Sequence, residues 1–174
     1  MLDKLREECA IIGTSLKCEE AAGVVYNGLL ALQHRGQEGA GIALSYNQSI
    51  VLEKDVGLVN EVLTEKVLAK LPKAKTAIGH ARYSTTGSNT IKNVQPFLTE
   101  YLTGRIATAH NGNITNAKQV RSMLEKEGLD FSATSDSEVI SSLIAFNIIS
   151  CKNLLKGVIE ASKILCGAFS LVLM

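Results

Sequence analysis

The sequence predicts an α+β fold, because its strand-like segments gather early in the chain and most of its helical segments come later. No strict strand–helix alternation runs through it, which favours separate α and β layers over a doubly wound parallel sheet. The 174 residues contain no internal repeat, no low-complexity tract and no interdomain linker. This length and 46% hydrophobic residues are sufficient for the core of one domain.

The expected strands are short runs rich in apolar and β-branched residues. The first begins at Cys9, directly after a charged lead, and nothing before Cys9 is apolar enough to join a core. Two further strands form a hairpin through residues 46–48. The strands after the first are expected at 39–45, 49–54, 75–80, 105–110 and 167–174.

The expected helices have apolar residues at helical spacing and recognisable ends. Asn116 with Gln119, and Ser135 with Glu138, have the spacing of capping boxes, and Asn153 is an expected N-cap. The helices are expected at 19–34, at 61–70, from Asn116 to Gly128, from Ser135 onwards, and from Asn153 to about Leu165.

Composition excludes several classes of function. Lysine and arginine number 18 against 17 acids, so there is no basic field for nucleic acid. The N-terminus lacks the apolar run of a signal peptide, and no apolar stretch is long enough to cross a bilayer. The four cysteines lack metal-site or disulfide-framework spacing, so we expect a reducing, cytoplasmic environment.

Four clusters of polar residues lie where strands are expected to end, the usual place for sites on rigid scaffolds. They are Cys9, the segment 32–41, the segment 79–87, and the segment 109–113 with 135–138 after it. Each has a simpler explanation by itself. Asn111-Gly112 is typical of a turn, Asp136 suits a helix N-terminus, and Cys9 could be a small buried hydrophobe. A zinc site from Cys9 and the histidines is possible, but no pair has ligand spacing.

Cys9 would acquire catalytic chemistry if residues 1–8 were removed. It would then carry a thiol and a free α-amine, groups that titrate near pH ~8.5 and ~8 and form a nucleophile with its own base.

Together these groups resemble the glutamine amidotransferases of the N-terminal-nucleophile class, and within it the glutaminase part of the amidophosphoribosyltransferase family. The resemblance covers residues 8–174. It is carried by six segments in this order: Glu8-Cys9, 34–41, 79–83, Asn93-Val94-Gln95-Pro96, 110–113 and 135–138.

The resemblance implies a four-layer αββα sandwich with a leader peptide over 1–8 and a glutaminase domain over 9–174. It implies glutamine as substrate, no cofactor in this chain, and ammonia delivery to a phosphoribosyltransferase domain that makes phosphoribosylamine in purine synthesis. Mg²⁺ and an iron–sulfur cluster would belong to that absent half, and the full-length protein would be a homo-oligomer. No nucleic-acid or membrane partner is expected.

The resemblance also implies the catalytic roles. Cys9 would attack the glutamine side-chain amide with its freed α-amine as base, giving a thioester. The side chain of Asn111 and the backbone N–H of Gly112 would form the oxyanion hole.

Further roles concern substrate binding. Arg82 would bind the α-carboxylate of glutamine and Asp136 its α-ammonium. Arg35, Tyr83 and Thr85 would lie near the pocket.

Two alternatives remain. The glutaminase domain of glucosamine-6-phosphate synthase usually begins at Met-Cys and has Tyr-Asp at Gln37-Glu38 and Trp at Tyr83. The second alternative belongs to a different class of function. It is an inactive module with the glutaminase fold, either non-catalytic or unprocessed. One departure from the family is Ala10, where Gly is common, and its methyl would either crowd the oxyanion region or be harmless.

Overall fold

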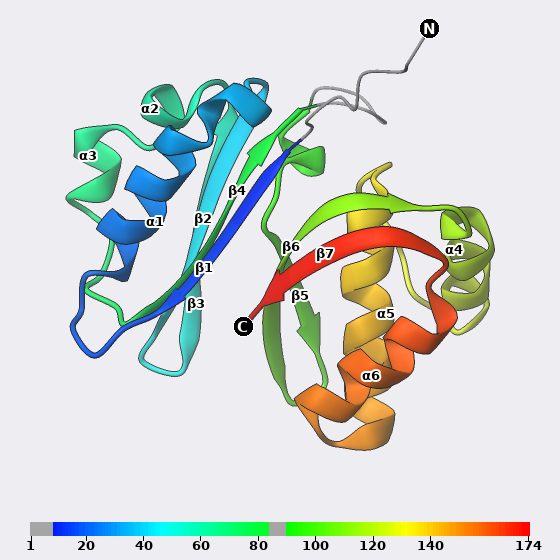
Figure 1. The fold of residues 1–174 in the computed structure, drawn as a ribbon. Coiled ribbons are helices and arrows are strands. Elements are labelled where there is room, and N and C mark those ends of the chain that lie inside the picture. Colours follow the sequence, from blue (N-terminus) through cyan, green and yellow to red (C-terminus); the bar gives the residue numbers. More distant parts are fainter. Residues whose placement is uncertain (1–8, 84–89) are drawn as a thin grey trace, which may run out of the picture.

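The computed structural model describes residues 9–83 and 90–174. The expected leader over 1–8 and Thr85 lie outside these ranges. Two antiparallel sheets face each other, and helices cover the outer face of each sheet (Figure 1). The predicted α+β class and the αββα order of layers are therefore confirmed.

The first sheet has four strands in the order β1-β4-β2-β3. The β2–β3 hairpin is confirmed, with a turn at Asn47 and Gln48, whose φ angles of 47° and 60° suit a tight two-residue connection. The strands are β1 (Ala10–Ser15), β2 (Gly39–Tyr46), β3 (Ser49–Val56) and β4 (Thr76–Arg82).

Helix α1 (Ala21–Ala31) covers this sheet, and a 3₁₀ turn, η1 (Gln33–Arg35), leads from it towards β2. The single helix expected at 61–70 is instead two one-turn helices, α2 (Val59–Val62) and α3 (Glu65–Leu68). They separate because the Thr64 side chain accepts a hydrogen bond from the Val67 N–H and starts a new helix.

The second sheet has three strands in the order β5-β6-β7. They are β5 (Phe97–Tyr101), β6 (Gly104–Ile114) and β7 (Gly167–Leu173). Strand β5 was not predicted, and β6 continues beyond its predicted end at residue 110. A 3₁₀ turn, η2 (Ile91–Asn93), precedes β5.

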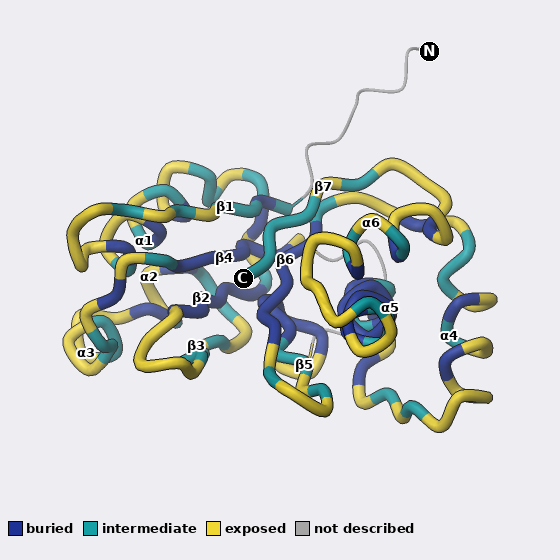
Figure 2. The backbone as a smooth tube through the Cα atoms, turned by 90° about the horizontal axis from the view of Figure 1, so that it is seen from below, coloured by how far each residue is buried: buried dark blue, intermediate teal, exposed yellow. Residues whose placement is uncertain are grey.

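Helix α5 (Asp136–Cys151) packs on this second sheet, and α4 (Ala117–Lys126) and α6 (Leu154–Ile164) pack against α5. Helix α5 is buried over most of its length, whereas α4 and α6 expose one face (Figure 2). The apolar residues of α5 occur on all sides of the helix, as expected for a helix surrounded by protein. Between the two sheets, Ala43, Ala107 and Ala109 are buried around Ile78, and larger, partly buried side chains such as Leu52 and Val172 pack against them.

The predicted helix ends are partly right. Asn153 caps α6 by accepting from the Lys156 N–H, as expected. Asn116 occupies the N-cap position of α4 but makes no cap bond, because its side chain bonds the backbone of Ile164 and Cys166 instead. Ser135 caps α5.

Glu138 does not complete a capping box with Ser135. Its carboxylate accepts from the backbone N–H groups of Ser132 and Ala133, further back along the chain. Within the described ranges, no helix has both the length and the apolar character needed to span a membrane.

Candidate functional site

Cys9 lies directly before β1, beside the C-terminal end of β4. Its thiol donates to the carbonyl oxygen of Tyr83 at 3.3 Å, and the Tyr83 N–H lies 3.4 Å from the sulfur as a donor. Cys9 has a φ of 57°, which is uncommon outside glycine and occurs often at functional sites. The half-buried thiol is thus held against the backbone of the neighbouring strand.

Arg35 and Tyr83 both contact Cys9. The Arg35 guanidinium donates from Nε to the Cys9 carbonyl oxygen at 2.9 Å, from the end of η1. Tyr83 follows β4 and is 41% exposed. Residues far apart in the sequence therefore surround the nucleophile candidate, although Arg35 is seen to bind its main chain rather than an open pocket.

Ala10 does not project towards the second sheet. It is buried in the core cluster between the first sheet and α1, together with Ala21 and Val25. Its neighbour Ile11 packs between the two sheets. The methyl that replaces the family's usual glycine is therefore accommodated in the core beneath α1.

Arg82 is almost completely buried at the end of β4, with 5% of its surface exposed. Side chains alternate along a strand, and Ile78 of β4 packs between the sheets. His80 and Arg82 follow on the same face. A guanidinium at this depth requires anionic or hydrogen-bonding partners, and Arg82 has interactions within the protein.

His80 is fully buried next to this arginine, and neither of its ring nitrogens has a hydrogen-bond partner among the described residues. Burial lowers the pKa of His80 to about 3, the charges of His110, Arg82 and Lys54 act in the same direction, and an interaction with the His110 backbone opposes them. The imidazole is therefore neutral at physiological pH, and it adds no second positive charge beside Arg82.

Asn111 and Gly112 lie within β6 rather than in a turn after it, so the turn explanation is wrong. They pair with Ser170 and Phe169 of β7. Gly112 has a φ of 136°, and a Cβ there would lie 2.3 Å from the Ala168 carbonyl oxygen. Glycine is required by both backbone conformation and space, at the residue expected to donate its N–H to an oxyanion.

Asp136 begins α5, where the helix dipole favours a carboxylate. Its Oδ2 accepts from the Ile114 N–H at 3.4 Å, which links α5 to the end of β6. Its Oδ1 lies 3.9 Å from His110 Nδ1. Burial lowers the pKa of His110, although the charge of Asp136 opposes this. A neutral His110 leaves the negative charge of Asp136 available to a cationic ligand.

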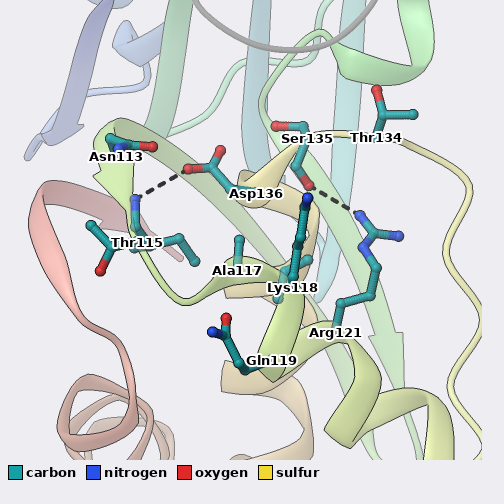
Figure 3. Close-up of a pocket in the computed structure, with 11 residues that line it drawn as sticks. Asn113, Thr115, Ala117, Lys118, Gln119, Arg121, Thr134, Ser135 and Asp136 are labelled. Carbon is teal, nitrogen blue, oxygen red and sulfur yellow. Dashed lines mark hydrogen bonds between the residues drawn. The ribbon is translucent and has the colours of Figure 1, made fainter.

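A cavity of about 470 Å³ opens beside Asp136 (Figure 3). Its wall includes polar side chains from α4 and from the segment before α5. Arg121 donates to the carbonyl oxygens of Ala133 and Ser135 and stacks 4.3 Å from the Phe131 ring. The cavity lining is Asn113, Ile114, Thr115, Ala117, Lys118, Gln119, Arg121, Thr134, Ser135, Asp136 and Val139. Of the predicted site residues that the structure describes, the cavity lining contains Asp136 alone.

The structure thus brings the predicted residues together in two groups. Cys9, Arg35 and Tyr83 are in direct contact. Asp136 lies near His110, the residue before Asn111, and His110 in turn acts on His80 beside Arg82. In Figure 1 the start of β1, the end of β4 and the start of α5 lie at the same end of the sandwich.

Sequence reasoning assigned no role to Gln95, Ser137 or Lys54. Gln95 and Ser137 hydrogen-bond each other and His110. Lys54 donates to the carbonyl oxygens of Val94 and Pro96, and burial lowers its pKa to about 8, against the charge of Glu138. No local sequence pattern marks these three side chains, because their partners lie on elements distant in the sequence.

Across residues 9–83 and 90–174, no three His, Cys, Asp or Glu side chains gather as a metal site would require. The possible zinc site of Cys9 and the histidines therefore gains no support from the described residues.

The chain is similar in sequence and in structure to known proteins. The sequence pattern of the glutamine amidotransferase domain matches residues 80–174. Amidophosphoribosyltransferase 3, chloroplastic, of Arabidopsis thaliana is 46% identical over 170 residues, which cover 98% of this chain and 31% of that protein.

Two solved structures are also similar. One is the glutamine phosphoribosylpyrophosphate amidotransferase of B. subtilis complexed with ADP and GMP, with a TM-score of 0.81 and 38% identity over 94% of this chain and 34% of that one. The other is described as the allosteric regulatory enzyme of purine biosynthesis, with a TM-score of 0.83 and 39% identity over 94% and 35%. The chain spans about a third of the length of these relatives.

Proposed function

Because this chain belongs to the glutamine amidotransferase domain family, with amidophosphoribosyltransferases among its relatives, we propose that it hydrolyses glutamine to glutamate and ammonia through Cys9. The observation that carries this proposal is the position of Cys9. Its sulfur is fixed against the end of β4 next to Arg82, on the sheet that faces Asn111 and Gly112.

The reaction begins with proton transfer from the Cys9 thiol to its free α-amine. The sulfur attacks the side-chain carbonyl carbon of glutamine, and the tetrahedral oxyanion accepts from Asn111 Nδ2–H and the Gly112 N–H. The α-ammonium passes this proton to the amide nitrogen, which leaves as ammonia, so that a γ-glutamyl thioester and a neutral amine remain. Water activated by the same amine then cleaves the C–S bond, which releases glutamate and regenerates the thiol.

The need for a free α-amine on Cys9 explains why residues 1–8 must be removed before the reaction. While residue 8 is attached, the nitrogen of Cys9 belongs to an amide and cannot accept a proton. Cleavage between Glu8 and Cys9 is therefore part of the proposal, on a segment outside the described residues.

Substrate recognition would use the zwitterionic head of glutamine. Arg82 is a buried cation and suits the α-carboxylate, and Asp136 is a carboxylate beside a neutral histidine and suits the α-ammonium. Arg35 supports this arrangement by fixing the main chain of Cys9. Tyr83 holds the sulfur, and Thr85 stays a predicted pocket residue.

In the whole protein we propose that the ammonia reaches a phosphoribosyltransferase part and makes phosphoribosylamine in purine synthesis. The names of the similar proteins support this reaction and do not favour glucosamine-6-phosphate synthase. Mg²⁺ and an iron–sulfur cluster would belong to that part, and no cofactor is proposed for residues 9–174. Oligomerisation of the full-length protein and a cytoplasmic location also belong to the proposal, and four free thiols support a reducing compartment.

The test compares two forms of one protein. The first begins at Cys9, with its free amine checked by intact mass, and the second retains residues 1–8 with Glu8→Pro to block removal. Glutamate release from glutamine should occur in the first form and be negligible in the second. Equal activity in both forms would overturn the mechanism, and no activity in either form would leave the inactive-module alternative.

A further inference from the structure

The segment Asn93-Val94-Gln95-Pro96 is buried although it belongs to a connection between elements. Asn93 and Gln95 are only 1% and 5% exposed. A buried amide side chain is costly unless its donors and acceptor are satisfied, so these two residues need specific partners. The partners of Gln95 lie on the strand and the helix that carry Asn111, Gly112 and Asp136, and the partner of Asn93 is Thr134, just before that helix.

The Gln95 side chain pairs with both backbone groups of His110. Its Oε1 accepts from the His110 N–H at 2.7 Å, and its Nε2 donates to the His110 carbonyl oxygen at 3.1 Å. The β5–β6 pairing ends at Phe97 with Thr108, and Pro96 has no N–H with which to continue it. The side-chain amide thus supplies the next step of the ladder, directly before Asn111.

A third bond connects this point to α5. Gln95 Nε2 also donates to Ser137 Oγ at 3.0 Å, and Ser137 Oγ lies 3.0 Å from His110 Nδ1. The same hydroxyl donates to Asp136 Oδ1 at 3.4 Å. One side chain therefore links the backbone before Asn111 to the residue that follows Asp136.

The segment that carries Gln95 is itself held from two sides. Lys54 of β3 donates to the carbonyl oxygens of Val94 and Pro96. The Asn93 side chain donates to Thr134 Oγ1 at 3.1 Å and accepts from the Thr134 N–H at 3.0 Å. Gln95 is thus fixed relative to both sheets and to the start of α5.

We propose that Gln95 is a positioning residue for the amidotransferase reaction, setting the distance between the Asn111–Gly112 oxyanion donors and the Asp136 carboxylate. This inference rests on the proposed function. A glutamine molecule bound by its head at Asp136 must place its side-chain carbonyl at Asn111 and Gly112. Its length is fixed, so a shift of either end misplaces the reacting carbon, and a displacement of about 1 Å can cost ~100-fold in rate.

The test uses protein that begins at Cys9 and two reagents. A glutamine-shaped diazo ketone needs both the head site and the oxyanion donors, whereas iodoacetamide needs only the thiol. In Gln95→Met, which has similar length and no amide, labelling of Cys9 by the diazo ketone and kcat for glutamine should fall about 10- to 100-fold. Labelling of Cys9 by iodoacetamide should change less than twofold.

Ser137 and Ser141 provide a matched pair one helical turn apart. Both are buried on α5 and face β6, but Ser141 bonds Thr108 and Thr99, away from the site. Ser137→Ala should slow the diazo ketone several-fold, Ser137→Thr should restore much of the rate, and Ser141→Ala should have no such effect. This series decides the question if Gln95→Met does not fold.

Two results would overturn the inference. One is equal slowing of both reagents in Gln95→Met, and the other is equal effects of the two alanine variants. If unaltered protein with a free Cys9 amine does not hydrolyse glutamine, the proposed function fails and this inference fails with it. Activity in that protein with unchanged kinetics in Gln95→Met and Ser137→Ala removes the inference alone.

Discussion

The backbone N–H of Tyr83 points at the sulfur of Cys9 from 3.4 Å, across the ends of β4 and β1. A donor in this position stabilises negative charge that develops on the sulfur as the thiol loses its proton. It also holds the sulfur in one place before substrate binds. The other three cysteines have different surroundings, and Cys18 and Cys166 are exposed.

The first prediction follows from this difference. In protein that begins at Cys9, one equivalent of a glutamine-shaped diazo ketone should label Cys9 and leave Cys18, Cys151 and Cys166 unmodified. Peptide mass spectrometry locates the label. Excess glutamine should protect Cys9, and Cys9→Ser should remove both label and glutaminase activity, since a hydroxyl hardly ionises near neutral pH. Label on another cysteine would contradict the assignment.

The second prediction concerns Asp136. Asp136→Asn keeps the shape but removes the charge, so KM for glutamine should rise about 10- to 100-fold, the range expected for a charged hydrogen bond. Stability should fall by only about 0.3–1 kcal/mol from the lost helix-dipole interaction. Urea unfolding and glutaminase kinetics measure the two effects. A large loss of stability with unchanged KM would show that Asp136 is structural.

Arg82 gives the third prediction. Lysine retains the positive charge but cannot donate two parallel hydrogen bonds to a carboxylate. Arg82→Lys should therefore raise KM for glutamine about 10-fold or more. Labelling of Cys9 by iodoacetamide, which has no carboxylate, should be unchanged. If both reactions slow together, the buried guanidinium acts on the thiol or on packing rather than on the substrate.

Local patterns predicted most elements of this fold, because the strands and helices carry their own periodicity. The exceptions depend on contacts distant in sequence. Asn111-Gly112 has the local signature of a turn, but β7 pairs with it from more than fifty residues away and keeps it extended. Glu138 has capping-box spacing, yet the chain before α5 folds back to offer it other N–H groups.

The candidate site likewise contains residues that could be predicted from the sequence and one that could not. The resemblance carried by six short segments identified Cys9, Arg82 and Asp136 as candidates, and a cation and an anion suit the head of an amino acid. Nothing local indicated Gln95, because its partners His110 and Ser137 lie on two elements that only the tertiary fold brings together.

The fourth prediction compares two glycines. Gly112 and Gly128 both have positive φ, but a Cβ at Gly112 would meet Ala168 and Phe169, whereas at Gly128 it would meet nothing within 4 Å. Gly128→Ala should cost about 1–2 kcal/mol of unfolding free energy and leave glutamine hydrolysis intact. Gly112→Ala should cost more than this and also lower kcat. Similar losses for both would mean that the close approach of β7 relaxes freely.

The last prediction concerns pH and His80. The folded chain keeps His80 neutral, with its pKa lowered to about 3 by burial, while the unfolded chain has the ordinary value of 6.5. Between these values the unfolded chain binds one more proton. Stability from this group is therefore complete above pH 6.5 and is lost as the pH falls towards 3, by about 2 kcal/mol between pH 7 and pH 5.

Urea unfolding at pH 7, 6 and 5 measures this dependence. His80→Leu removes the titrating group and keeps a buried side chain, so its unfolding free energy should fall less steeply with decreasing pH than that of the unaltered protein. The lowered pKa of His110 gives a slope of the same sign, so a residual slope is expected in the variant. An identical pH dependence in the two proteins would show that His80 takes up a proton in the folded state.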